Sequence, residues 1–518
     1  MTSQVVTSLA THMLRVREST KQIFAIARAY STLSLASQPQ MQKVFFRNLA
    51  FLLSLNLIIK PLWIFGIDRT VQNVVGAENY GLYFVLTNLS FLTQIILDLG
   101  ISNYNNRLIA QQEDLLAKQL SHIFSIKLIL SGVYLLVTLF AAVVLKYSGH
   151  QLYLLLLICF NQVLASLIAY LRSNISALHH FKVDSMLSVM DKALMLIVCG
   201  ALLNIHSLRS KFIIDWFVYA QLGAYIITLV TAFVYVLSIS GKISLSFSFS
   251  FSIDLLKKAF PFALLIGLMA IYGKIDGVMI QNLLPEEGHR EAGLYASAYR
   301  LLDALNQFGY LFSVLLLPIF SRMLAGNKPI DELVKSSFTV IFIMSVIAAL
   351  CLSFYSLPIM HMLYHESSEY SAGILSVLIL TFVATSAIYV FSTLLTANNN
   401  LKELTFIALT AVGINLLLNF ILIPKVKACG AAESSVATHF FIIIIQIVLA
   451  KKVFRFRLNY SLLLKLSIFV ITTLTVLYFS KQLELNWIIS MFGAAVLSLL
   501  CAFVLGLVQY SRIRLLFQ

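Results

Sequence analysis

Long apolar runs dominate this sequence and set the first limit on its fold. About fourteen of them are long enough, at roughly 20 residues each, to cross the hydrocarbon core of a bilayer as a helix. A chain in lipid must satisfy its own backbone hydrogen bonds, and these runs are too long for barrel strands. The sequence therefore predicts an all-α integral membrane protein. The expected spans are 45–66, 80–101, 122–146, 151–172, 185–205, 212–238, 258–282, 298–320, 336–358, 371–396, 402–423, 430–450, 461–480 and 486–509.

The composition agrees with this class. Of the 518 residues, 60% are hydrophobic and only 11% are charged, whereas soluble domains carry about 25% charged residues. The five cysteines are scattered, without the spacing of a metal site or a disulfide framework. We expect no metal and no cofactor, and coupling to an H⁺ or Na⁺ gradient stays open.

The formal net charge of +15 follows the expected topology. With the N-terminus in the cytoplasm, about 24 Lys and Arg residues fall on the inner side and about 8 on the outer side. Both termini are therefore predicted to be cytoplasmic. Because this distribution explains the charge and no basic soluble module is visible, we expect membrane lipids and no nucleic acid as partners.

The first forty residues differ from the rest of the chain. Residues 1–40 have four basic residues, one acidic residue and no continuous apolar segment, so they are not a secretory signal. Two interpretations remain open. The segment is a cytoplasmic extension, Arg- and Ser-rich like a transit peptide or a surface-lying amphipathic helix, or it is an extended start with Met41 as the natural beginning. We assign it no role in the mechanism.

A weak internal repeat organises the spans. The segment "AENYGLYFVLTNL" (77–89) aligns with "HREAGLYASAYRL" (289–301), and "NRLIA" (106–110) aligns with "SRMLA" (321–325). Parallel repeats of this kind predict two pseudo-symmetric six-helix lobes with the substrate path between them. We expect an N-lobe at 41–240, a C-lobe at 241–452 and two additional helices at 453–518. The short loops leave no room for a soluble domain, which is typical of a transporter.

The same segments carry a resemblance to a known family. "GAENYGLYFVLTNLSFLTQIILDLGISNYNNRLIA" (76–110), "EAGLYASAYRLLDAL" (291–305) and "GINLLLNFILIPKVKACGAAESSVAT" (413–438) resemble polysaccharide biosynthesis proteins of the Wzx type, the O-antigen flippases. These belong to the multidrug/oligosaccharidyl-lipid/polysaccharide (MOP) exporter superfamily, which shares the MATE-like fold. The resemblance implies a non-enzymatic flippase in the bacterial inner membrane. It would move undecaprenyl-pyrophosphate-linked oligosaccharide, such as a lipopolysaccharide repeat unit, by alternating access, together with other polysaccharide assembly proteins.

One lysine lies deep in the first helix of each lobe. A rise of about 1.5 Å per residue places Lys60 and Lys274 about 22 and 21 Å from the inner ends of their spans. A charge at this depth costs about 2.5–3.5 kcal/mol on insertion scales, so each needs a reason. We expect Lys60, Lys274 and Arg300 to line a substrate cavity and to attract a pyrophosphate. For each lysine the alternative is snorkelling to the outer interface. Pro61 is expected to bend the first span.

Asp276 cannot pair with Lys274, because residues two positions apart on a helix point about 200° apart. Two roles remain open for it. It forms a structural ion pair with Arg300 on the next helix, or it titrates or binds a cation and so couples transport to an ion gradient. Asp303 stands one turn from Arg300, at an i,i+3 spacing that permits pairing.

Further charges are expected near the inner ends of the spans. They are predicted to form an inner gate whose ion pairs break and form again during transport. The alternative is positive-inside anchoring with local pairs. The residues are Asp98, Arg107, Lys127, Arg172, Asp191, Lys192 and Arg322.

Three other functions are compatible with this architecture. A multidrug/cation antiporter would be expected to favour acidic residues in its cavity, whereas the deep charges are mostly basic. A lipid II flippase shares the fold and is not separated by charge. A membrane glycosyltransferase or polymerase would need acidic or histidine pairs on an outer loop. "PEEGHRE" (285–291) and "HMLYHESSEY" (361–370) are the outer segments that offer such residues.

Overall fold

A computed structural model gives the fold of the chain. It describes residues 54–102, 116–178, 180–240, 249–456, 459–483 and 485–507, together with residues 51, 105 and 109. The chain divides into two compact units, Met1–Leu55 and Asn56–Gln518, and the second holds nearly all of the described residues. The predicted extension at 1–40 and the inner-gate candidate Arg107 lie outside the described residues.

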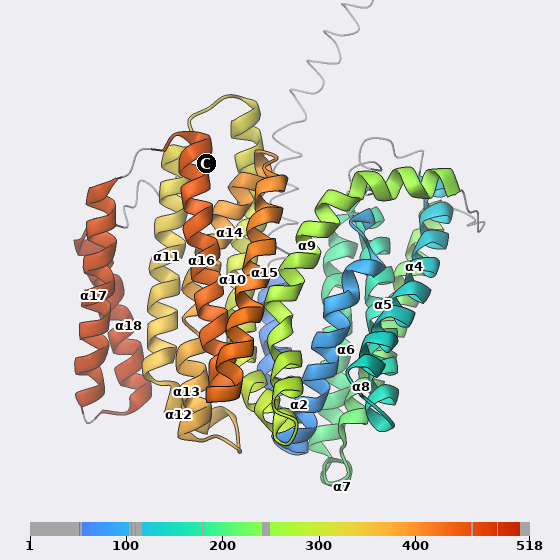
Figure 1. Cartoon of the computed structure of the whole chain (residues 1–518), viewed down its shortest axis with the longest axis horizontal. Coiled ribbons are helices and arrows are strands. Elements are labelled where there is room, and N and C mark those ends of the chain that lie inside the picture. Colours follow the sequence, from blue (N-terminus) through green and yellow to red (C-terminus); the bar gives the residue numbers. More distant parts are fainter. Residues whose placement is uncertain are drawn as a thin grey trace, which may run out of the picture. The chain divides into compact units, whose positions relative to one another are not determined.

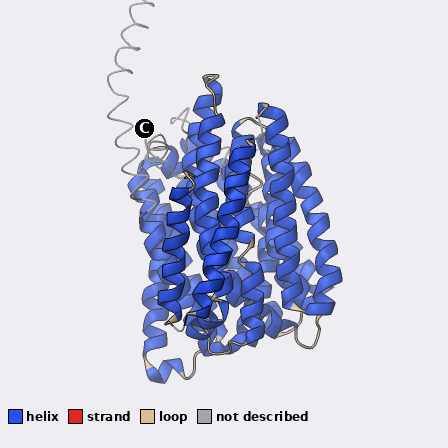
Figure 2. Cartoon of the chain, turned by 90° about the vertical axis from the view of Figure 1, so that its left-hand side faces the viewer, coloured by secondary structure: helices blue, strands red, loops and turns tan. Residues whose placement is uncertain are grey.

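Every element of regular secondary structure in the described residues is a helix, and none of these residues forms a strand (Figure 2). We call residues 56–240 the N-half and residues 249–456 the C-half. After a helical segment that reaches residue 62, the N-half continues with η1 (Trp63–Asp68), α2 (Arg69–Thr93), η2 (Gln94–Leu97), α4 (Leu116–Val144), α5 (His150–Ala177), α6 (Phe181–Asn204), α7 (His206–Arg209) and α8 (Ile214–Ser240). The C-half comprises α9 (Phe249–Leu283), α10 (Gly288–Ala325), α11 (Asp331–Phe354), α12 (Ser356–Leu363), α13 (Glu369–Leu378), α14 (Thr381–Ala397), α15 (Leu401–Val426) and α16 (Ala428–Phe454). Then follow α17 (Tyr460–Gln482) and α18 (Trp487–Val504), which pack against each other and against α11 (Figure 1).

Thirteen helices in the described part of the chain are long and apolar enough to cross a membrane. The first of them, Ser54–Leu97, is 44 residues long and is interrupted at Gly76, so it corresponds to two of the expected spans. The prediction of an all-α membrane protein with about fourteen spans is therefore confirmed.

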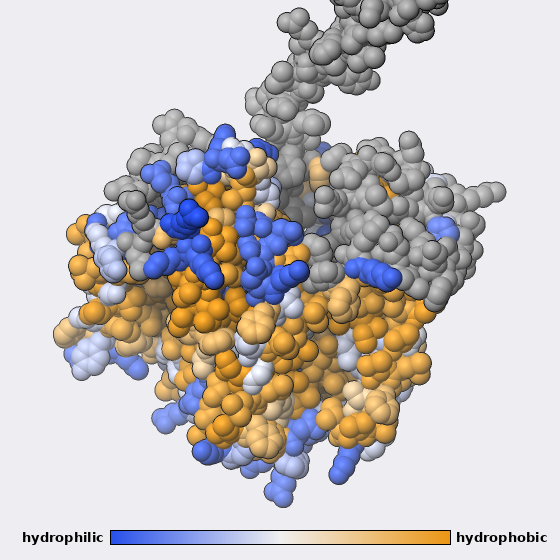
Figure 3. All heavy atoms as spheres, turned by 45° about the horizontal axis from the view of Figure 1, so that its top comes forward, coloured by the Kyte–Doolittle hydropathy of each residue, from blue (hydrophilic) through white to orange (hydrophobic). Residues whose placement is uncertain are grey.

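The outer surface of these helices suits lipid. Phe140, Ile197 and Phe406 are 71%, 70% and 67% exposed, although they lie within long helices. Figure 3 shows apolar side chains over much of the visible flank, with hydrophilic side chains gathered toward its ends. Large apolar side chains stay exposed in this way where the surrounding medium is hydrocarbon rather than water.

The first long helix is irregular at two places. Two residues after Pro61, the helix widens into a π-helical turn at Trp63–Asp68. Proline removes a backbone donor, and π-turns of this kind occur frequently at functional sites. At Gly76 the backbone has φ 81° and ψ 163°, which breaks the helix. Only glycine adopts this conformation without strain, so the chain forms two helical pieces here instead of one.

The backbones of α2 and α10 approach each other very closely where the two halves meet. A Cβ atom on Gly81 would lie 1.8 Å from the carbonyl oxygen of His289, and one on Gly293 would lie 1.9 Å from the carbonyl oxygen of Ala77. The same 212 positions separate Ala77 from His289 and Gly81 from Gly293, which is the offset of the repeated Gly-Leu-Tyr motif. The partner of Gly81, His289, is therefore the repeat-equivalent of Ala77, the partner of Gly293. A pseudo-two-fold relation between the halves produces this reciprocity.

Substituting Gly293 by Ala should destabilise the protein, because the added methyl group collides with backbone that cannot move aside. Overpacking of this kind costs about 1–3 kcal/mol. We expect a lower melting temperature for purified G293A. The control is G413A, since Gly413 lies inside α15 with nothing within 4 Å of an added Cβ. G413A should melt at or above the wild-type temperature. Equal melting temperatures for the two variants would contradict the close contact.

Candidate functional site

Lys60 links the first helix of the N-half to the C-half. Its ammonium nitrogen Nζ donates to Oε1 of Gln307 on α10 at 3.2 Å. The charges of Asp191 and Lys192, both on α6, also act on it. Lys60 thus lies where the two halves meet.

Lys274 occupies a similar place on the first helix of the C-half. Its Nζ donates to the hydroxyl of Tyr299 on α10 at 3.1 Å. It lies over the ring of Tyr299 at 4.6 Å and over that of Phe91, on α2, at 5.5 Å. Because Phe91 belongs to the N-half, Lys274 also lies where the two halves meet. Neither Lys60 nor Lys274 has a carboxylate within ion-pair distance among the described residues.

Both lysines contact one polar face of α10. At 100° per residue, Tyr299, Arg300, Asp303 and Gln307 fall within about 100° of one another around the helix axis. The contacts of Lys274 and Lys60, at Tyr299 and Gln307, are separated by about 12 Å along that axis. This face of α10 is the centre of the candidate site.

Arg300 is held by a carboxylate that no sequence pattern had singled out. Its Nε lies 2.6 Å from Oδ2 of Asp68, which is completely buried, and 3.0 Å from the hydroxyl of Tyr80. That hydroxyl donates to the same Asp68 oxygen at 2.7 Å. Asp68 and Tyr80 belong to the N-half, so a buried ion pair joins the halves. The predicted first span ends at residue 66 and so leaves Asp68 in an outer loop, whereas the helix continues to the break at Gly76.

Asp276 has a different environment from the one expected. The predicted ion pair between Asp276 and Arg300 is wrong, because Arg300 contacts two other carboxylates. These are Asp68 and, through Nη1 at 3.6 Å, Asp303. Asp276 instead faces α15 and α16, because its side chain points away from the face that carries Lys274. It is 2% exposed and accepts four hydrogen bonds, all from neutral groups. The donors are Asn419 (2.7 Å) and Asn415 (3.3 Å) on Oδ1, with Tyr295 (2.8 Å) and Ser435 (2.5 Å) on Oδ2.

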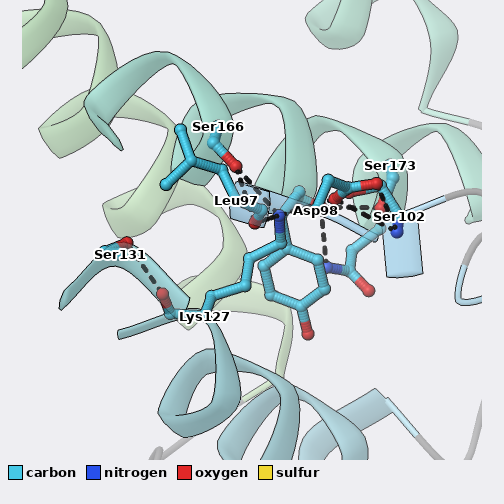
Figure 4. A network of polar contacts seen from close by, with 9 residues as sticks. Leu97, Asp98, Ser102, Lys127, Ser131, Ser166 and Ser173 are labelled. Carbon is cyan, nitrogen blue, oxygen red and sulfur yellow. Dashed lines mark hydrogen bonds and ion pairs between the residues drawn. The ribbon is translucent and has the colours of Figure 1, made fainter. Parts of the chain in front are cut away.

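Asp98 and Lys127, two of the inner-gate candidates, pair within the N-half (Figure 4). Nζ of Lys127 lies 2.6 Å from Oδ1 of Asp98 and also donates to the Leu97 carbonyl and the Ser166 hydroxyl. Lys127 is 1% exposed. This saturated pair braces η2 against α4 and α5, all of which belong to the N-half.

The remaining inner-gate candidates do not form one group. Arg172 pairs with Asp184 at 2.7 Å, and Arg322 is exposed at the end of α10. The placement of Asp191 and Lys192 at the inner end of their span is wrong. Lys192 lies about 16 Å along α6 from its first residue, since eleven residues rise about 1.5 Å each. The two residues pair at 2.9 Å, and Lys192 lies over the Trp63 ring at 4.7 Å, beside the Lys60 region.

Hydrogen bonds also join the two halves at the Gly76 break. Nδ2 of Asn73 donates to the Leu363 carbonyl at 2.9 Å, and the His365 amide donates to Oδ1 of Asn73 at 3.1 Å. The Ala77 amide donates to Oε1 of Glu366 at 3.3 Å. Glu366 thus caps the helix that restarts after Gly76. No group of three or more metal-ligating side chains occurs among the described residues, this segment included.

Comparison with known proteins gives the family and the fold of this chain. Residues 45–324 match the family of polysaccharide biosynthesis proteins. The chain belongs to this family. Solved structures of MOP superfamily transporters share the fold over more of the chain than the family match covers, so the predicted MATE-like fold is confirmed. No curated protein matches the sequence.

Three solved structures illustrate the fold. The lipid II flippase MurJ, in an inward closed conformation, has a TM-score of 0.66 at 14% identity and covers 90% of this chain and 97% of its own. An inward-facing multidrug resistance MATE transporter of the MOP superfamily has a TM-score of 0.57 at 14% identity, covering 76% of this chain and 94% of its own. A MOP superfamily transporter from Pyrococcus furiosus has a TM-score of 0.55 at 10% identity, covering 80% and 96%. At sequence identities of 10–14%, these comparisons show a common fold and nothing further.

Asp276→Ala should destabilise the protein more than Lys274→Ala, although the two residues are neighbours. D276A leaves four buried donors without their acceptor, and a buried unsatisfied donor costs about 1–3 kcal/mol. K274A leaves the Tyr299 hydroxyl its bond to the Gly273 carbonyl. We expect a drop of ~3 kcal/mol or more for D276A, measured as a lower melting temperature in detergent. A greater loss in K274A would contradict the described hydrogen bonds.

Proposed function

We propose that this protein is a flippase that moves undecaprenyl-pyrophosphate-linked oligosaccharide across the bacterial inner membrane by alternating access. Family membership and the transporter fold support movement of a lipid-linked substrate. Two lysines support the choice of an anionic substrate. Lys60 and Lys274 contact the polar face of α10, and neither has a carboxylate partner among the described residues.

The balance of charge in the site favours an anion. Four basic residues gather here, Lys60, Lys192, Lys274 and Arg300, with three acids, Asp68, Asp191 and Asp303. The acids are already engaged: Asp68 and Asp303 contact Arg300, and Asp191 contacts Lys192. Lys60 and Lys274 form no ion pair among the described residues, and a low-dielectric site strengthens their attraction for phosphate. On this face of α10, a cation antiporter would need the reverse, free carboxylates and paired bases.

The alternatives are weakened to different degrees. For a polymerase or glycosyltransferase, the outer segment at 361–370 would have to supply catalytic groups, but its Glu366 caps a helix instead. A lipid II flippase carries the same pyrophosphate-linked lipid chemistry and remains the nearest alternative. The proposed orientation has both termini in the cytoplasm, as the positive-inside distribution predicts.

Asp276 is the proposed coupling site for an H⁺ or Na⁺ gradient. It is an isolated carboxylate inside the C-half, surrounded by amide and hydroxyl groups that also carry oxygen atoms. Hard cations prefer such oxygens, and a proton would neutralise the carboxylate without displacing a partner cation.

Loss of the protein should stop export of the glycan while its lipid-linked precursor accumulates inside the cell. A deletion strain is assayed for surface glycan and for precursor on the inner leaflet, and is complemented with variants. K60A and K274A should restore less than about a tenth of export at normal protein abundance, because the charges that bind pyrophosphate are gone. K328A is the control, since Lys328 is exposed on a loop. Increased drug sensitivity without precursor accumulation would favour the antiporter.

Asp276→Asn should remove the dependence of transport on the driving ion. Proteoliposomes with an imposed Na⁺ or pH gradient are loaded with radiolabelled lipid-linked sugar, and its transfer between leaflets is followed. The wild-type rate should rise with one of the gradients, whereas D276N should respond to neither. D331N, at an exposed helix start, is the control. Gradient-driven transport by D276N would exclude Asp276 as the coupling site.

A further inference from the structure

The ion pair of Asp68 with Arg300 is unusual because it is buried at the boundary between the two halves. It joins the first helix of the N-half to α10 of the C-half, and it is buried. Alternating access requires the halves to move against each other, so contacts that cross between them have to break in each cycle. A buried carboxylate that loses its partner is left uncompensated, and another group must then balance each charge.

Asp68 is only partly satisfied in its present place. Its Oδ2 forms the ion pair with Arg300 and accepts a hydrogen bond from the Tyr80 hydroxyl, whereas Oδ1 is buried without a hydrogen-bond partner. Asp276 shows the contrast, since each of its oxygens accepts two hydrogen bonds. Both carboxylate oxygens of Asp276 are therefore fixed by hydrogen bonds, whereas only one oxygen of Asp68 has partners.

Arg300 likewise keeps part of its binding capacity. Its Nε is occupied by Asp68 and Tyr80, but Nη1 is 3.6 Å from Asp303 and the side chain is 14% exposed. A guanidinium presents its donors in a planar fork that matches a carboxylate or a phosphate. Tyr299 and Gln307, the contacts of Lys274 and Lys60, lie on the same α10 face as Arg300, so the remaining Nη donors of Arg300 are the ones that an anion drawn to the lysines would meet.

We propose that Asp68 is a positioning residue that occupies Arg300 in the unloaded transporter, and that the substrate's diphosphate takes its place. This proposal rests on the proposed function and deepens it. Exchange of one anion for another leaves Arg300 paired at every stage. It also breaks the link between the halves only when the substrate is present, so an empty transporter does not open to the outer side.

The first test measures binding of inorganic pyrophosphate to the purified full-length protein by titration calorimetry. Asp68→Asn removes the competing charge and keeps the shape, and we expect D68N to bind pyrophosphate at least tenfold more tightly than wild type. Arg300→Gln should weaken binding by a similar factor. Tyr80→Phe, which loosens the pair without changing any charge, should tighten binding about threefold and serves as the second variant if D68N is unstable.

The matched control is Asp303→Asn. It removes the same charge near Arg300, but Asp303 lies on α10 itself and does not link the halves. Exchange is therefore distinguished from simple electrostatics by a second readout, thiol labelling of Leu294→Cys. Leu294 is 8% exposed and lines a small outer pocket between the halves with Gln72, Asn73 and Glu366. The partly exposed Cys429 and Cys501 are replaced by Ser in all variants.

Labelling in detergent does not depend on membrane orientation. In wild type and in D303N, pyrophosphate should accelerate labelling of Cys at position 294 several-fold. In D68N labelling should be fast already without pyrophosphate. The proposal is overturned if D68N binds pyrophosphate no better than wild type, or if D68N and D303N label alike. It is also overturned if no variant binds pyrophosphate, whereas the proposed function is judged separately by precursor accumulation in cells.

Discussion

The reciprocal contact of Gly81 and Gly293 is the constraint on which the rest of the site depends. Two helices approach so closely only where neither carries a side chain, and the approach sets the distance between the halves. It brings the first helix of the N-half against the polar face of α10. Lys60 and Asp68 then reach Gln307 and Arg300 across the boundary. A larger separation would leave each of these charges alone in a medium that solvates it poorly.

The charged side chains inside the spans differ in how many of their hydrogen-bonding atoms have partners. Those with a full set of partners stabilise the fold, whereas those with an incomplete set are the ones to which we assign a function in substrate binding. Lys127 and Asp98 are saturated within one half and brace three elements of it. Asp276 is saturated by neutral groups. Lys60, Lys274 and Asp68 are not saturated, and all three lie where the halves meet. Partial satisfaction of a charge is costly in a membrane, and these three charges lie at the boundary that would change in the proposed transport cycle.

The spans and the repeat could be predicted because both depend on local patterns. Apolar length identifies a span, and the Gly-Leu-Tyr motif at Gly81 and Gly293 marks equivalent positions. The divergence of Lys274 and Asp276 follows from helical geometry alone. The partners of these charges could not be predicted, because they lie on other helices. Asn415, Asn419 and Ser435 have no sequence signal that directs them to Asp276, and Asp68 falls two residues past the predicted end of its span. Asp191 and Lys192 lie within their predicted span, 185–205, but their depth is wrong. The sequence does not show that mutual pairing and the Trp63 ring stabilise both charges in the middle of α6.

The hydrogen bonds at the Gly76 break would limit how tightly the proposed transporter closes at that end of its helices. Asn73, Ala77 and the segment from Leu363 to Glu366 exchange three hydrogen bonds there. Each is worth only about 0.5–1.5 kcal/mol net where water replaces the lost partner when the contact opens. In the proposed cycle, closure by apolar packing of the same extent would have to expose hydrocarbon to water each time. Hydrogen bonds of this modest strength would let that end of the helices open again at a small cost in free energy.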